Sequence, residues 1–217
     1  MPSPTSCGAV GGTGEAWAPV VAAPYEDDPD ARPDSRGGDA MRVEASTGAA
    51  TNVAIDADGW HGDIFVDARS LAIVEIAVRA DWADEIDLSA DSRAATTVAV
   101  SAAGLHGDIE VDAAAIAFAW VSVSTAWAEH LELDVGALAE IDIFITAPDM
   151  RGDIRVNTEA SASASADAWW WGGGGGPAVD ADLHAAAPIY IRIDAPNLDG
   201  QIFLTSASDA TTEIWLG

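Results

Sequence analysis

Residues 107–111, Gly-Asp-Ile-Glu-Val, form a motif that recurs along the chain and decides the fold. Related copies of the motif begin at Gly62, Gly152 and Gly200, so successive copies lie 45, 45 and 48 residues apart. A second, diverged set lies between these copies, near Val43, Ile86, Leu131 and Val179, and reduces the step to 21–25 residues. A fixed period of this size is typical of repeat architectures. The sequence therefore predicts eight units of about twenty-two residues from Val43 onward.

Apolar and polar residues alternate within each unit, as in residues 141–145, Ile-Asp-Ile-Phe-Ile. A period of two is typical of strands with one buried face. Two short strands and two turns in about twenty-two residues match one coil of a parallel β-helix, in which equivalent positions stack about 4.8 Å apart. We therefore expect an all-β fold, a β-solenoid of about eight 22-residue coils, with a length of roughly 35 Å.

The 45-residue spacing leaves an alternative architecture open, because identity is higher at 45 residues than at 22. Four antiparallel strands per 45 residues would suit a four-bladed propeller or a β-sandwich. The solenoid is the favoured interpretation.

A large apolar side chain precedes the anchor of most units by four residues. The members of this set are Trp60, Trp82, Leu105, Trp127, Met150 and Leu198. In a 22-residue solenoid they would stack at one corner and exclude water between coils. Packing in the core is therefore preferred to sugar stacking as their role.

Composition and charge exclude several classes of protein. The chain has 217 residues, with 36 Asp and Glu against 9 Lys and Arg, and a formal net charge of −27. Such a surface repels a nucleic-acid backbone, so nucleic-acid binding is not expected. The single Cys7 provides neither a disulfide framework nor a thiolate metal cluster. No secretion signal is visible in residues 1–30, and no apolar run reaches the roughly twenty residues of a membrane helix, so no membrane span is predicted.

Domain boundaries follow from the same periodicity. Residues 1–40 are rich in Pro, Gly and acidic side chains and are predicted to form a flexible, acidic N-terminal arm. Residues 41–217 are predicted to form the β-repeat domain.

Carboxylates recur one residue before the anchor, at Asp63, Glu85, Asp108 and Asp153. In a solenoid they would form a column in which like charges repel unless cations bridge them, so calcium is a hypothesis for this column. Turn residues that point to water are the preferred interpretation, because Gly-Asp is common turn chemistry. No other cofactor is predicted. His61 and His106 occupy equivalent positions two 22-residue coils apart, about 9.6 Å, which is too far to share a zinc ion.

Three consecutive tryptophans, Trp169, Trp170 and Trp171, precede a glycine run at 172–176. They are either a loop that folds back over a thin part of the core or a site where a ligand docks. No nucleophile elbow, phosphate loop or dinucleotide motif occurs, so the chain is not predicted to be an enzyme.

The Gly-Asp-Ile-x-Val repeats at 107–111 and 152–156 resemble the bacterial adhesin-like families of short β-strand repeats, of the autotransporter-adhesin head-domain type. This resemblance covers residues 41–217 and implies a solenoid-like, non-catalytic surface or scaffold protein.

The function expected from these observations is that of a structural or interaction protein of the fibre, adhesin or virion-surface type that presents an acidic β-repeat surface. A terminal strand near residues 211–217 has an open edge, so self-association or docking of a protein partner is expected there. The location is left open, and a position outside the cell or on a virion surface is favoured. The alternative is a carbohydrate-binding module or polysaccharide-acting β-helix protein with glycan as its partner, and a toxin-like or regulatory module is left open.

Overall fold

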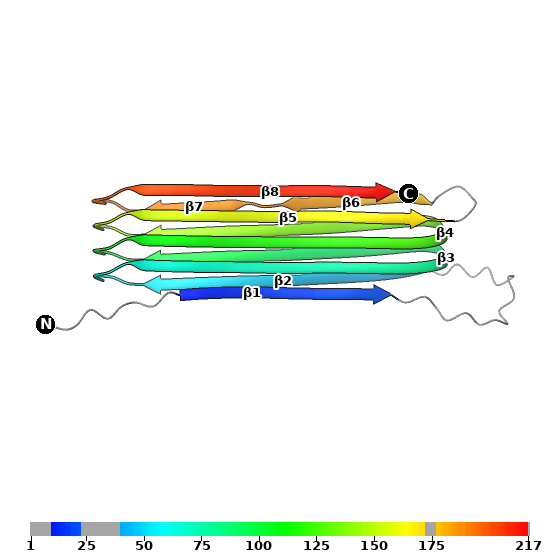
Figure 1. Ribbon diagram of the computed structural model, residues 1–217, viewed down its shortest axis with the longest axis horizontal. Helices are drawn as coiled ribbons and strands as arrows, with labels where there is room; N and C mark the ends of the chain where they lie inside the picture. Colours follow the sequence, from blue (N-terminus) through cyan, green and yellow to red (C-terminus); the bar gives the residue numbers. More distant parts are fainter. Residues whose placement is uncertain (1–9, 23–39, 172–176, 217) are drawn as a thin grey trace.

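The computed structural model describes residues 10–22, 40–171 and 177–216, which form an all-β, solenoid-like stack of parallel strands in two sheets (Figure 1). The strands are β1 (Val10–Ala22), β2 (Ala40–Asp56), β3 (Ile64–Ser101), β4 (Ile109–Thr146), β5 (Ile154–Trp170), β6 (Ala178–Ala186), β7 (Ile189–Asp194) and β8 (Ile202–Leu216).

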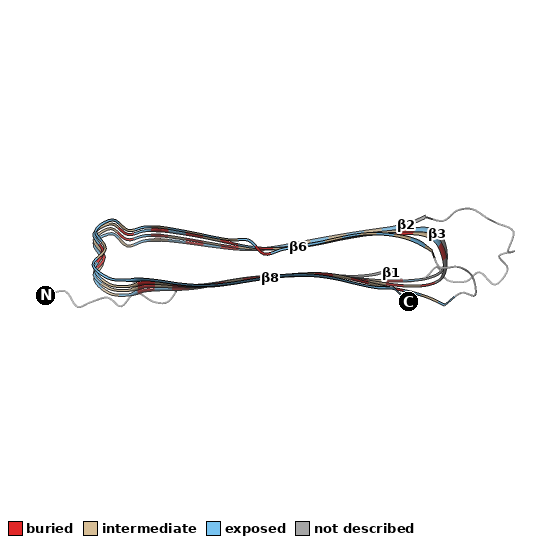
Figure 2. Ribbon diagram, turned by 90° about the horizontal axis from the view of Figure 1, so that it is seen from above, coloured by how far each residue is buried: buried red, intermediate tan, exposed pale blue. Residues whose placement is uncertain are grey.

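The chain alternates between the two sheets as it climbs the stack. The first sheet contains β1, residues 64–79 of β3, residues 109–125 of β4, β5 and β8. The second sheet contains β2, residues 85–101 of β3, residues 130–146 of β4, and β6 with β7. Strands β3 and β4 pass from one sheet to the other at one end of the molecule, and short corners connect the sheets at the opposite end (Figures 1 and 2).

The register shows that one coil contains 45 residues in most of the stack. Ile64 pairs with Ile109, and Ile109 pairs with Ile154. The predicted 22-residue coil is therefore wrong, because each 22-residue unit supplies one strand to one sheet and makes half a coil. The two short strands expected within a unit merge into one long strand, since alanine and serine rather than turn residues separate them. First-sheet strands form five successive rows, so the stack is about 19 Å high rather than 35 Å.

The offset lengthens from 45 to 48 residues in the last full coil. Thr125 still pairs with Trp170, whereas His130 pairs with Ala178. The three extra residues therefore lie between Trp170 and Ala178, the segment that contains the glycine run.

Parallel pairing excludes the alternative architectures. Every strand pair and isolated bridge among the described residues is parallel. A propeller blade or a sandwich of hairpins needs antiparallel neighbours, so both alternatives are wrong.

The corners between the sheets have one local design. The third residue after the end of the preceding strand has a positive φ of 57–68°. This residue is Gly59, Gly104, Asp149 or Asn197. Glycine, Asp and Asn are the residues that tolerate this left-handed conformation best. Three residues later, Gly62, Gly107 and Gly152 also have positive φ. The backbone of the preceding coil passes so close to Gly107, Gly152 and Gly200 that a Cβ would overlap it.

The core is a thin layer between the two sheets, wider at its ends than at its middle (Figure 2). Inward residues at the ends are large, such as Ile76, Ile109 and Ile143, and all are fully buried. Inward residues near the middle are mostly alanine, and buried hydroxyls there reach the opposite sheet. Ser92 Oγ donates to the Ala72 carbonyl at 2.9 Å, and Thr96 Oγ donates to the Ala114 carbonyl at 2.8 Å. We call this narrow middle part the waist.

The predicted apolar ladder separates into two columns. Trp60, Leu105, Met150 and Leu198 follow one another at the corner, and Leu105 and Met150 are fully buried. Trp82 and Trp127 pair with each other at the opposite end of the coil. The single ladder was wrong because consecutive 22-residue units lie on opposite sheets.

Part of the predicted N-terminal arm is a strand. Residues 10–22 form β1, which pairs with β3 from Val10↔Val66 to Ala22↔Val78. Residues 1–9 and 23–39 lie outside the described residues.

Candidate functional site

Three of the predicted calcium ligands form a column, but backbone amides are their partners. Asp63 Oδ1 accepts the backbone N–H of Asp108 at 2.9 Å, and Asp108 Oδ1 accepts that of Asp153 at 2.9 Å. Asp153 Oδ1 in turn accepts the backbone N–H of Gln201 at 3.1 Å. Each carboxylate thus ties its corner to the next coil.

An arginine neutralises the upper part of this column. Arg155 donates to Asp108 Oδ2 at 3.0 Å and to Asp153 Oδ2 at 2.7 Å. The Asp153 backbone N–H, and then the Arg155 guanidinium, lower the pKa of the Asp108 carboxyl because both favour its charged form. The guanidinium therefore offsets the like-charge repulsion between Asp108 and Asp153.

Glu85 does not belong to this column. It pairs with His130 in the second sheet, at the opposite end of the coil, roughly 50 Å away along the strands. The predicted column of four carboxylates is therefore wrong for Glu85, because consecutive half-coils lie on opposite sheets. In the described ranges, no group of three or more His, Cys, Asp or Glu is placed to hold a metal ion.

His61 and His106 lie in adjacent coils rather than two coils apart. They form a parallel bridge, and their ring centroids are 4.7 Å apart in an edge-to-face arrangement. The predicted separation was wrong for the same reason as the coil length. The rings pack against each other on the corner, and Arg151 continues the column in the next coil.

The predicted tryptophan site lies at the end of β5. Trp169 and Trp171 are 58% and 51% exposed, and Trp170 is half-buried. Arg79 lies over the Trp171 ring, with 5.8 Å between its Cζ and the ring centroid. The loop that was expected to fold back over the core is absent at residues 161–170, which form a regular strand. The alanines of this stretch face the waist, and the serines lie on the outer side.

Two further tryptophans share the outer surface of the first sheet with Trp169. Trp120 is 41% exposed and donates from Nε1 to Asp167 Oδ2 at 3.2 Å. Trp215 is 63% exposed and pairs in register with Asp167. Trp120, Asp167, Trp169 and Trp215 are called the aromatic patch below. Sequence reasoning missed Trp120 and Trp215, although the alternation within their strands places both residues on the outer side.

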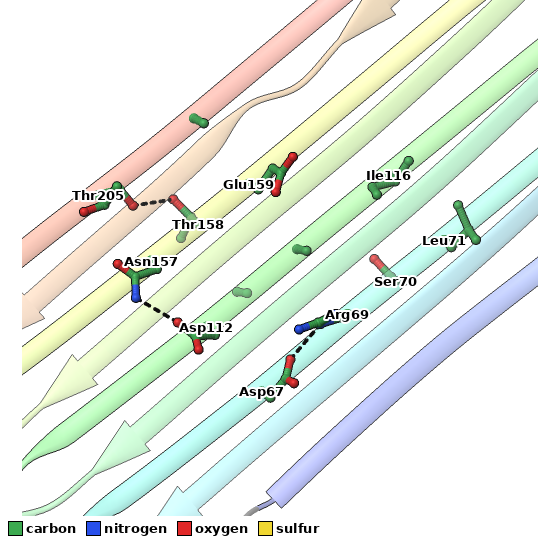
Figure 3. Close-up of a pocket in the computed structure, with 13 residues that line it drawn as sticks. Asp67, Arg69, Ser70, Leu71, Asp112, Ile116, Asn157, Thr158, Glu159 and Thr205 are labelled. Atoms are coloured by element: carbon green, nitrogen blue, oxygen red, sulfur yellow. Dashed lines mark hydrogen bonds and ion pairs between the residues drawn. The ribbon is translucent and has the colours of Figure 1, made fainter.

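A shallow depression of about 760 Å³ crosses the same outer surface over the waist (Figure 3). It forms where Ala114 and Ala207 stand between longer side chains. Asn157 Nδ2 donates to Asp112 Oδ1 at 2.8 Å, and Arg69 forms an ion pair with Asp67 at 2.9 Å. These polar groups are thus already paired with one another along the walls.

The last strand, β8, differs from strand β5, with which it pairs. Its inward residues are exposed, with Leu204 at 55% and Leu216 at 51%, whereas their partners in β5, Val156 and Ala168, are 0% and 1% exposed. The edge of β8 that faces away from β5 has no partner strand in the described part of the chain. An apolar row and a free strand edge therefore coincide at this end of the stack.

Comparison with known protein families, curated proteins and solved structures finds no match for this chain. The described residues include no helix with the length and apolar character needed to cross a membrane.

Proposed function

We propose that this protein is a non-catalytic structural or interaction protein of the fibre, adhesin or virion-surface type. It presents a rigid, acidic β-repeat surface and associates with itself through the β8 end. The observation that carries this proposal is the exposed inward row of β8, since the same row is buried in the strand below it. Exposed apolar rows and free strand edges are the features through which β-sheets pair with other chains.

The distribution of charge supports association through the ends rather than the faces. On the outer surface of the second sheet, Asp87, Glu132 and Asp180 stack directly in register, and Arg42 completes the column. Two such faces would repel each other. Strand β8, in contrast, contains only Asp209 and Glu213 as charged residues. Because the whole chain has a net charge of −27, association should strengthen as salt screens the repulsion.

Two adjacent threonines allow a matched test of this end. Thr212 is in register with the buried Ala164, so it belongs to the inward row, whereas Thr211 is in register with Ser163 on the outer side. We expect Thr212→Lys to weaken self-association at least tenfold, equivalent to about 1.4 kcal/mol, because the lysine would be buried in the interface between two copies. Thr211→Lys adds the same charge and should associate like the unmodified protein.

Sedimentation velocity over a range of protein and salt concentrations measures this difference. A monodisperse monomer at high protein concentration, or equal association of both variants, would contradict the proposal.

A second candidate function, glycan binding, is favoured by the aromatic patch. Trp120 and Trp215 lie two coils and two residues apart, about 12 Å, so they could stack separate rings of an extended glycan. The Asp167 carboxylate between them could accept hydrogen bonds from sugar hydroxyls.

For this candidate we expect binding on a glycan array that Trp120→Ala or Trp215→Ala weakens roughly tenfold, about 1.4 kcal/mol. Phe65→Ala is the matched control, because Phe65 is 41% exposed like Trp120 but lies at the other end of the sheet. An array without hits, or equal losses for all three variants, would remove glycan binding from consideration.

A further inference from the structure

The two ends of the stack carry unequal sheets. The first sheet runs β1-β3-β4-β5-β8 and therefore has a strand at each end that extends past the second sheet (Figure 1). If two copies stacked with both end strands in place, β8 of one copy would lie on β1 of the next. The first sheet would then contain one strand more than the second at every junction. Beyond the junction, the strands of the two sheets would no longer lie at matching heights.

We propose that β8 of one copy takes the place of β1 in the next copy, so that copies join head to tail into a continuous solenoid. This inference rests on the self-association proposed above and specifies its partner and its geometry. Removal of β1 from its position equalises the two sheets, because β8 and the neighbouring copy's β2 then form one composite coil.

The register makes this exchange geometrically consistent. Ala68, Ala113, Thr158 and Ser206 occupy equivalent positions in successive coils, and Gly12 occupies the same position in β1. A continued register would therefore place Ser206 beside Ala68 of the next copy and Leu204 beside its Val66. Strand β8 has 15 residues and β1 has 13, so the incoming strand spans the whole edge that β1 covers.

The hydrogen-bonding edges also match. The inward residue Ile154 donates its backbone N–H upward, to the Gln201 carbonyl of the next row, at 2.9 Å. Ile202 is in register with Ile154, so the inward residues of β8 direct their N–H groups away from β5. The carbonyl groups of a further parallel row could accept these hydrogen bonds.

Strand β8 matches the rest of the first sheet better than β1 does. Its inward row has Ile202 and Leu204 at one end and Ile214 and Leu216 at the other. This row repeats the pattern of β3, in which Ile64 and Val66, then Ile76 and Val78, enclose a waist of small residues. In β1, Gly11, Gly12, Gly14 and Pro19 occur within thirteen residues, and both residue types are unfavourable in strands.

The second sheet is also incompletely covered at the β1 end. Val43 and Ile55 of β2 are only partly buried, whereas their register partners Leu88 and Val100 are 0% and 3% exposed. The larger side chains of β8 would cover this row. On the outer side, Phe203 would lie beside Phe65 and Ala207 beside Arg69. The aligned strands contain one like-charge pair, Glu213 with Glu75, which salt would screen.

Cysteine cross-linking distinguishes exchange from simple stacking. In one variant, Ser206→Cys is combined with Ala68→Cys, and in the other with Gly12→Cys, with Cys7→Ser in both. Within one chain, Ala68 and Ser206 are three rows apart, about 14 Å, beyond the reach of a disulfide. Ala68 has Gly12 as its partner while β1 is in place. A disulfide that joins position 206 of one copy to position 68 of another therefore requires β1 to leave.

The variants are oxidised mildly, at concentrations at which the unmodified protein associates. We expect the variant with cysteines at positions 206 and 68 to give a ladder of covalent oligomers on a non-reducing gel. The variant with cysteines at positions 206 and 12 should give few covalent oligomers, and reduction of the disulfides should abolish the ladder. Cross-linking through Gly12 instead of Ala68, or through neither although the protein associates, would overturn the exchange and leave self-association standing. A protein that stays monomeric in sedimentation refutes the proposed function itself and the exchange with it.

Discussion

Replacement of Gly107 by alanine should lower the free energy of unfolding by about 3–5 kcal/mol, a large loss for a single methyl group. A Cβ at Gly107 would overlap the carbonyl oxygen of Gly62 in the neighbouring coil. Its φ of 156° also disfavours any side chain. The two backbone segments cannot move apart without loss of hydrogen bonds. Gly62 N–H donates to the His106 carbonyl at 3.0 Å, and Gly107 N–H donates to the Arg151 carbonyl at 2.9 Å.

The control for this substitution is Gly48→Ala. Gly48 lies in β2, and the nearest atom to its added Cβ would be the Arg93 carbonyl oxygen at 3.9 Å, an ordinary contact. We expect Gly48→Ala to be neutral or to stabilise the protein by up to about 1 kcal/mol. Urea unfolding followed by circular dichroism measures both variants. Similar midpoints for Gly107→Ala and Gly48→Ala would show that the coils can separate at the corner without cost.

Replacement of Ala117 by leucine should destabilise the protein by about 3 kcal/mol, because the waist has no room for a larger side chain. Ala117 is fully buried and pairs in register with Ala72 and Ala162. The Ala72 carbonyl accepts a 2.9 Å hydrogen bond from Ser92 of the opposite sheet. A leucine in this column would force the sheets apart and break such bonds between them.

The matched control is Ala114→Leu in the same strand. Ala114 faces outward and lines the depression of the first sheet, so a leucine there extends into open space. We expect its free energy of unfolding to change by no more than about 0.5 kcal/mol. Thermal unfolding compares the two variants. If Ala117→Leu and Ala114→Leu have the same melting temperature, the waist is wide enough for larger aliphatic side chains. Close packing of the two sheets would then not explain why alanine occupies the waist.

From Val43 onward, the sequence predicts where the repeated strands and corners lie, but it does not predict which strands are neighbours. Strand β1 is not predicted, because residues 10–22 lie in the segment expected to be a flexible arm. Alternation in residues 141–145 and the glycine at each corner are local signals, because they depend on which face of a strand is buried and which residue tolerates a positive φ. Asp63, Asp108 and Asp153 were correctly grouped, since they share one position in identical motifs. Glu85 was added to them wrongly, because its half-coil belongs to the other sheet.

The exposed tryptophans illustrate the same limit. Trp169, Trp170 and Trp171 form a run that the sequence alone reveals, whereas Trp120 and Trp215 each stand alone. Only the register brings these two residues and Asp167 together on one surface. A sequence pattern identifies the outer side of each strand, but it contains no information about which strand lies beside it.

By itself, the sequence determined that the chain forms repeated strands with one buried face, where the corners fall, and that the surface is acidic. These properties follow from the hydrophobic period, from glycine's backbone freedom and from charge, all of which are local. The tertiary structure decided that a coil takes 45 residues instead of 22 and that the Trp and Asp series divide between two sheets. It also decided that no described residue covers the inward row of β8. The physical reason is that a half-coil and a full coil have the same local pattern, and only the hydrogen bonds between distant strands distinguish them.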